Sequence, residues 1–205
     1  MKYSSLILVA ICVVVFVLQY SITGFTDTFV LDSSKVWQEP WRLITSIFLH
    51  GGLEHLVFNM FALALFGFIL ENTIDTRKFL FLFFVGGFVA SIFSAIFYSS
   101  SLGASGAIFA VIGTLAIVRW KMTVWFFGIP MPMFVAAVLW AITDIVGVFY
   151  PSNVANFAHL AGLGFGIIFA YFVREYIDKG EKKKKRVIKD DEIDEWEDFY
   201  FRKPK

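Results

Sequence analysis

Long apolar runs recur along this chain of 205 residues, and they constrain its fold more than any other feature. An apolar helix of about 20 residues crosses the hydrocarbon core of a bilayer, because a helix satisfies its own backbone hydrogen bonds in lipid. The composition agrees, with 58% hydrophobic residues, 26 Phe and only 17% charged residues. The sequence therefore predicts an all-α polytopic membrane protein built as a six-transmembrane-helix bundle.

The six predicted spans differ in length. In chain order they cover residues 6–21, 55–71, 79–98, 105–118, 131–148 and 156–176. The fourth span has only about 14 residues, or roughly 21 Å at the helical rise. That is too short for a core of about 30 Å, so its first residue, Ser105, is expected below the membrane surface, at the bottom of a depression.

The chain divides into a membrane domain, residues 1–177, and a charged tail, residues 178–205. The tail carries a basic block at 182–186, which is either simply solvated or attracted to anionic lipid headgroups. Residues 24–54 are aromatic and amphipathic, which is typical of a loop lying in the membrane interface.

Basic residues gather on one side of the predicted bundle. That side holds both termini together with Lys2, Arg77, Lys78, Arg119, Lys121 and residues 182–186. The opposite side has only Lys35 and Arg42. The positive-inside rule predicts a multi-pass protein of the cell membrane with both termini cytoplasmic, so Ser105 is expected to open to the exterior side.

Ser105 stands in the motif Gly103-Ala104-Ser105-Gly106, at the predicted start of the short fourth helix. Unpaired backbone N–H groups and the positive end of the helix dipole suit an alkoxide or a developing oxyanion at that place. The same small residues also suit simple close packing of transmembrane helices, and the motif alone does not separate the two interpretations.

The chain has three histidines, His50, His55 and His159, and all are expected in the exterior half of the membrane. A histidine in hydrocarbon is costly and needs a polar partner or a function. Three at one depth favour a single polar cavity. Serine is a weak nucleophile until a neighbouring base takes its proton, and the candidate bases are these histidines and Asp144.

His159 is favoured as the base because two faces of small residues match. One face consists of His159, Gly162 and Gly166, and the other of Gly106, Ala110 and Gly113. Close packing of these faces brings the imidazole to the Ser105 hydroxyl. Phe109, one turn after Ser105, is then placed to lie against the ring.

His55 and Asn59 are i, i+4 neighbours and project to one side of the second helix. Both are suitable hydrogen-bond donors for a tetrahedral intermediate, although Asn59 also suits a structural bond between helices. The loop position of His50 favours a gating or structural role. Asp144 has no partner evident from the sequence. It could orient a histidine, but nothing in the sequence shows this, and it is left without a role.

Other kinds of site find no support in the sequence. His50 and His55 are spaced i, i+5, which is off one helical face, and there is no His-Glu-x-x-His motif. Neither a Gly-rich phosphate loop nor a basic patch interleaved with aromatic residues is present. We therefore expect no metal, no cofactor and no nucleic-acid partner.

At this point the sequence resembles the rhomboid intramembrane serine proteases over about residues 1–177. The resemblance rests on Trp41-Arg42, His50-x4-His55-x3-Asn59, Glu71, Gly103-Ala104-Ser105-Gly106 and Ala158-His159-x-x-Gly162-x3-Gly166. It implies a Ser105–His159 catalytic dyad and an oxyanion site made by the Ser105 backbone N–H, His55 and Asn59. It also implies an endopeptidase that cuts within or next to the transmembrane segment of single-pass proteins, admitted by movement of the fifth span and the loop after it.

Two alternative functions are compatible with the same polar cavity. A membrane chaperone or sorting factor would hold polar transmembrane helices and would not need the serine hydroxyl. A channel or transporter is disfavoured, because the ionisable groups placed within spans, His159 and Asp144, both lie in the exterior half and none continues a path inward.

Overall fold

The structure, a computed structural model, describes residues 3–126, 128–150, 154–175 and 177. Four helices in this part of the chain are long and apolar enough to cross a membrane: Ser4–Ser21 (α1), Leu53–Ile74, Thr76–Phe97 (α6) and Asn156–Glu175. Two shorter apolar helices, Ser105–Val118 (α7) and Met133–Val148 (α8), complete the six predicted spans. The prediction of a polytopic helical membrane protein is confirmed. The tail predicted over 178–205 lies outside the described residues, and the division at residue 177 stays a prediction.

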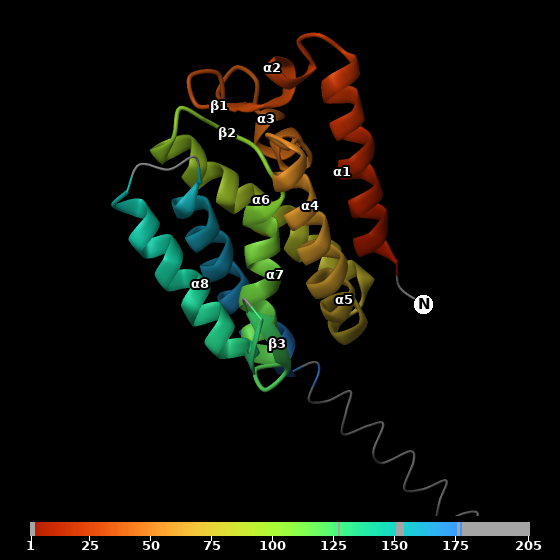
Figure 1. Ribbon diagram of the computed structural model, residues 1–205, viewed down its shortest axis with the longest axis vertical. Coiled ribbons are helices and arrows are strands. Elements are labelled where there is room, and N and C mark those ends of the chain that lie inside the picture. Colours follow the sequence, from red (N-terminus) through yellow and green to blue (C-terminus); the bar gives the residue numbers. More distant parts are fainter. Residues whose placement is uncertain (1–2, 127, 151–153, 176, 178–205) are drawn as a thin grey trace, which may run out of the picture. The chain divides into compact units, whose positions relative to one another are not determined.

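α7 is the central helix of the bundle, with α4, α6 and α8 around it (Figure 1). Ten of its 14 residues are buried. Glycines allow α6 to approach it closely: a Cβ added at Gly86 would lie 2.5 Å from the Cβ of Ala110, and one added at Gly106 would lie 2.4 Å from the Cβ of Ala90. Because α7 packs against several other helices, these helices together fix the position of its first residue, Ser105.

The second long helix contains a π-helical turn. It consists of α4 (Leu53–Ala62), the π turn η2 (Leu63–Gly67) and α5 (Phe68–Ile74). The buried carboxylate of Glu71 on α5 accepts hydrogen bonds from the backbone N–H groups of Ser4 and Ser5, each at 3.1 Å, and from the hydroxyl of Thr76. An anion is favourable at a helix N-terminus, so Glu71 fixes the start of α1.

The segment between α1 and α4 is folded rather than irregular. It contains α2 (Phe25–Phe29), β1 (Leu31–Asp32), α3 (Arg42–Thr45) and the 3-10 turn η1 (Ser46–Phe48). The buried guanidinium of Arg42 ion-pairs with Glu39 and donates to the backbone carbonyls of Asp27 and Val30. These bonds hold the segment together without a long secondary-structure element.

Two short sheets depart from the all-helical prediction. β1 pairs antiparallel with β2 (Ser100–Ser101), which ties the first loop to the residues just before Ser105. β3 (Thr123–Phe126) pairs antiparallel with β4 (Ile129–Pro132). The fifth span, predicted to start near Met131, starts two residues later, because Met131 and Pro132 belong to the hairpin and α8 begins at Met133.

Candidate active site

Ser105 and His159 come from different helices and meet side chain to side chain. Ser105 is the first residue of α7, and His159 lies in the first turn of the helix Asn156–Glu175. The Nε2 atom of His159 is 2.8 Å from the Oγ atom of Ser105. The two groups lie within hydrogen-bond reach, which is the geometry that proton transfer from an alcohol to an imidazole requires.

Close packing of small residues brings these two helices together. A Cβ added at Gly162 would lie 2.1 Å from the carbonyl oxygen of Gly106, and one added at Gly166 would lie 2.0 Å from that of Ala110. Both contacts are with backbone, which cannot rotate away as a side chain can. The two small-residue faces expected from the sequence are therefore the faces in contact.

The imidazole of His159 is held on two sides. Phe109, one turn after Ser105, stacks on it with 4.3 Å between ring centroids and 7° between planes. The Oδ1 atom of Asp144 on α8 lies 2.9 Å from Nδ1 of His159. The sequence did not indicate this second partner, since its only sign was a carboxylate within an apolar span.

His55 reaches the neighbourhood of Ser105 because Gly103 has no side chain. A Cβ added at Gly103 would lie 2.9 Å from Nε2 of His55 and 3.8 Å from Oγ of Ser105. Gly103 has a φ of 127°, in the region that glycine favours. The backbone N–H of Gly51 donates to Nδ1 of His55 at 3.4 Å. A nitrogen that accepts a hydrogen bond carries no proton, so this bond favours the neutral tautomer of His55 with its proton on Nε2.

Asn59 is buried on the same helix, with 7% of its surface exposed. Its Nδ2 donates to the backbone carbonyl of His55 at 2.8 Å. Among the described residues, no hydrogen bond joins Asn59 to Ser105. An amide nitrogen has two hydrogens, so one remains for another acceptor.

His50 lies behind His55, in the loop before α4. Its side chain is 2% exposed, and its ring meets the His55 ring edge to face at 5.1 Å. Gln19 of α1 holds its backbone, since Oε1 accepts from the His50 N–H at 2.9 Å and Nε2 donates to its carbonyl. Burial, with a smaller contribution from the charge of His55, lowers the pKa of His50 to about 4.

This lowered pKa predicts an acid-labile fold. A histidine with a pKa of about 4 when folded and about 6.5 when unfolded contributes stability above pH 6.5 that is lost as the pH falls toward 4. At pH 5 the loss is about 2 kcal/mol, or roughly 4–8 °C in Tm. Thermal unfolding in detergent should give a Tm that falls more between pH 7 and pH 5 in the wild type than in His50→Gln. The difference between the two decreases is the contribution of His50. An equal decrease in Tm in both proteins would contradict the prediction that protonation of His50 destabilises the fold.

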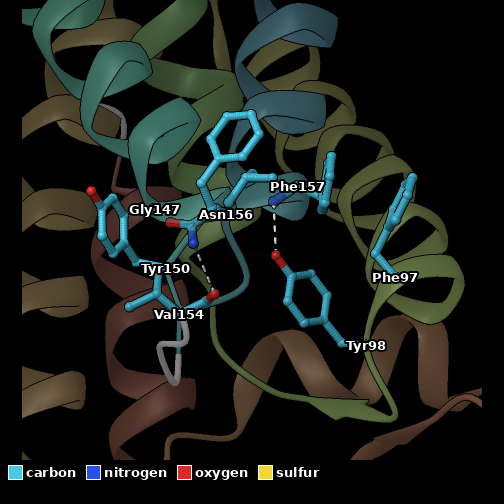
Figure 2. A pocket seen from close by; sticks show the side chains of 9 residues that line it. Phe97, Tyr98, Gly147, Tyr150, Val154, Asn156 and Phe157 are labelled. Atoms are coloured by element: carbon cyan, nitrogen blue, oxygen red, sulfur yellow. Dashed lines mark hydrogen bonds between the residues drawn. The ribbon is translucent and has the colours of Figure 1, made fainter.

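A cavity of about 360 Å³ lies beside this site, near the ends of α6 and α8 (Figure 2). It is lined by Phe97, Tyr98, Gly147, Val148, Phe149, Tyr150, Val154, Asn156 and Phe157. Tyr98 accepts a hydrogen bond from the backbone N–H of Phe157 at 3.1 Å, which fixes the first turn of the helix that carries His159 (Figure 2). None of the predicted site residues lines this cavity.

The described residues contain no group of three or more His, Cys, Asp or Glu side chains that could hold a metal ion. The polar groups that converge near Ser105 are a hydroxyl, two imidazoles and a carboxylate. These groups suit nucleophilic acyl transfer, in which a base activates the hydroxyl and N–H donors stabilise the oxyanion.

Comparison with known proteins identifies the family of this chain. The family model described as the Rhomboid domain matches residues 37–176. The chain is 35% identical to "RHOMBOID-like protein 6, mitochondrial" of Arabidopsis thaliana, over 70% of this chain and 47% of that protein. It is 36% identical to "Rhomboid protease GluP" of Bacillus subtilis over 61% of this chain and 24% of that protein. It is 28% identical to "Rhomboid protease GlpG" of Haemophilus influenzae over 82% of this chain and 88% of that protein.

The chain also matches RHOMBOID-like proteins 4 and 1 of Arabidopsis thaliana. Together with RHOMBOID-like protein 6, these relatives are longer than this chain, which spans 47% (protein 6), 36% (protein 4) and 38% (protein 1) of their lengths. The family domain nevertheless covers 140 residues of this chain, from 37 to 176. It includes both Ser105 and His159 and extends over the helices that carry them. Because this domain covers more than half of its length, the chain belongs to the rhomboid family.

Proposed function

We propose that this chain is an intramembrane serine endopeptidase, which hydrolyses a peptide bond within or next to the transmembrane segment of a membrane protein. The observation that carries the proposal is the distance of 2.8 Å between Nε2 of His159 and Oγ of Ser105, inside a bundle of apolar helices. Relatives named rhomboid proteases support the same reaction class. Ser105 is the nucleophile and His159 the general base.

The reaction follows from the proposed roles. His159 takes the proton of the Ser105 hydroxyl on Nε2 while Oγ bonds to the scissile carbonyl carbon, which gives a tetrahedral oxyanion. The imidazolium then gives this proton to the leaving amine, and an ester with Ser105 remains. Water, deprotonated by the same imidazole, hydrolyses the ester and restores the hydroxyl.

The oxyanion needs donors that are already in place. We assign this role to the backbone N–H of Ser105, to Nε2–H of His55 and to the second amide hydrogen of Asn59. Gly103 makes room for the His55 ring next to Ser105, and Gly51 fixes the ring tautomer. Donors held in this way require no reorganisation as the charge develops.

Substrates are expected to be single-pass membrane proteins cut near the exterior end of their transmembrane helix. This follows from the proposed topology, with both termini cytoplasmic and the site opening to the exterior side. A helical substrate hides its scissile carbonyl in a backbone hydrogen bond. Sequences with Gly, Pro or other weak helix formers near the outer surface should therefore be preferred.

The test is cleavage by the purified full chain in liposomes. A panel of single-pass proteins with Gly or Pro at the outer end of the transmembrane helix should be cut, and mass spectrometry of the products should map the cut within that outer segment. A folded protein that binds these helices stably and cleaves none would instead indicate a chaperone or sorting factor, and would contradict the proposal.

The oxyanion assignment makes a separate prediction. His55→Ala and Asn59→Ala should each lower kcat by about 10²–10³-fold, the usual cost of one oxyanion donor. Ser105 should still react covalently with a phosphonate, because its base remains. Single-turnover cleavage and labelling rates measure the two effects. Wild-type turnover in both variants would place the oxyanion site elsewhere.

A further inference from the structure

Asp144 is a buried carboxylate in an exposed stretch of α8. It is 6% exposed, whereas its neighbours Ile142 and Ile145 are each 49% exposed. Its Oδ1 lies 2.9 Å from Nδ1 of His159, and its Oδ2 is buried without a hydrogen bond to any described residue. A carboxylate is costly in such surroundings unless it is paired. Its pairing here is with the imidazole that faces Ser105.

Glu71 is the other buried carboxylate in the described part of the chain, and its contacts are those of a structural carboxylate. Glu71 receives two backbone N–H groups and the Thr76 hydroxyl, and fixes the start of α1. Asp144 receives a hydrogen bond from one group alone among the described residues. The Asp144 carboxylate is therefore stabilised by the His159 imidazole, whereas the Glu71 carboxylate is stabilised by backbone N–H groups at the start of α1.

We propose that Asp144 is a positioning residue that makes the Ser105–His159 pair a triad, an inference that rests on the proposed function. Because a carboxylate only accepts hydrogen bonds, Asp144 holds the ring proton on Nδ1 and leaves the Nε2 lone pair facing Ser105 Oγ. When Nε2 takes the hydroxyl proton, both ring nitrogens carry protons. The negative charge of Asp144 then balances the imidazolium until Nε2 gives its proton to the leaving amine, and Asp144 itself gains no proton.

α8 is packed so that this contact can form. Gly147, one turn after Asp144, faces Asn156, and a Cβ at Gly147 would lie 2.7 Å from Oδ1 of Asn156 (Figure 2). Asn156 is three residues before His159. The same pair of helix faces thus makes both contacts, so the orientation of the base depends on α8 being in place against the helix Asn156–Glu175.

The test compares Asp144→Ala and Asp144→Asn with the wild type in the liposome assay. Both variants should lose about a hundredfold or more in kcat with KM unchanged, because the substrate does not touch Asp144. Formate, a small carboxylate, should restore part of the kcat of Asp144→Ala, while formamide, its neutral counterpart, should not. Thr143→Ala is the matched control, since Thr143 is exposed on the same helix and its hydroxyl donates to the backbone carbonyl of Trp140 one turn before it.

The outcomes separate this inference from the proposed function. Absence of cleavage by the wild type would overturn the function itself. Wild-type cleavage with turnover within twofold in both Asp144 variants would overturn the triad alone. A slow Asp144→Ala enzyme that formate and formamide restore equally, or that neither restores, would also overturn it, because its loss would then be one of packing. Tm values of the purified variants report that packing directly.

Discussion

Ser105→Ala is expected to abolish cleavage of a single-pass substrate while the protein stays folded. The substitution removes the atom that bonds to the scissile carbonyl, and loss of a catalytic serine in a comparable site costs about 10⁶-fold in kcat. The fold should tolerate it, because alanine suits a helix and, among the described residues, the Ser105 hydroxyl loses one hydrogen-bond partner, the His159 imidazole. Cleavage in liposomes gives the rate, and thermal unfolding in detergent serves as the folding control.

His159→Ala should cost about as much as Ser105→Ala, and the double variant should be no slower than either one. Residues that act as one unit give such non-additive losses. Activity near the wild-type level in purified Ser105→Ala protein would refute the nucleophile assignment. Losses that multiply in the double variant would show that the two side chains act independently.

Gly162→Leu is expected to eliminate both cleavage and labelling of Ser105. Gly162 meets the backbone carbonyl of Gly106, with only 2.1 Å available between an added Cβ and that oxygen. Any side chain there must push the helix Asn156–Glu175 away from α7, and with it the His159 imidazole. A misplacement of about 1 Å can already lower the rate by 10²-fold, and a leucine side chain at this position requires a larger displacement of the helix.

Gly164 provides the matched control on the same helix. A Cβ added at Gly164 meets no atom within 4 Å, so Gly164→Leu should keep its activity. The milder pair Gly162→Ala and Gly164→Ala tests the same contrast if the leucine variant fails to fold. Gly164→Ala should be neutral or slightly stabilising, since alanine is the better helix former, whereas Gly162→Ala should be slower and less stable. Equal activities in the two alanine variants would contradict the close-contact account.

The bundle was predictable from sequence because lipid imposes one simple rule. A span must be apolar and helical, so apolar runs mark the helices, and the interruptions mark their ends. The fourth span was predicted at 105–118, and α7 is Ser105–Val118. The contact between α7 and the last helix was predictable for a similar reason, because small residues at helical spacing mark the faces that can approach each other.

The parts that sequence did not predict depend on partners distant along the chain. α8 starts at Met133, after the β3–β4 hairpin. The sequence did not predict the hairpin, because its two prolines suit an extended segment as well as a first helical turn. Asp144 and His159 meet only once α8 is packed, and nothing in the local pattern selects that face of α8. The bond from Asn59 to its own helix is likewise a rotamer choice that spacing does not fix.

The most direct measurement is covalent labelling with a mechanism-based phosphonate, followed by mass spectrometry of the modified peptide. The account predicts a single adduct on Ser105 in the wild-type protein and a severe loss of that adduct in His159→Ala, because the hydroxyl reacts only when the imidazole removes its proton. An adduct on a different residue, or labelling of Ser105 at the wild-type rate without His159, would contradict it.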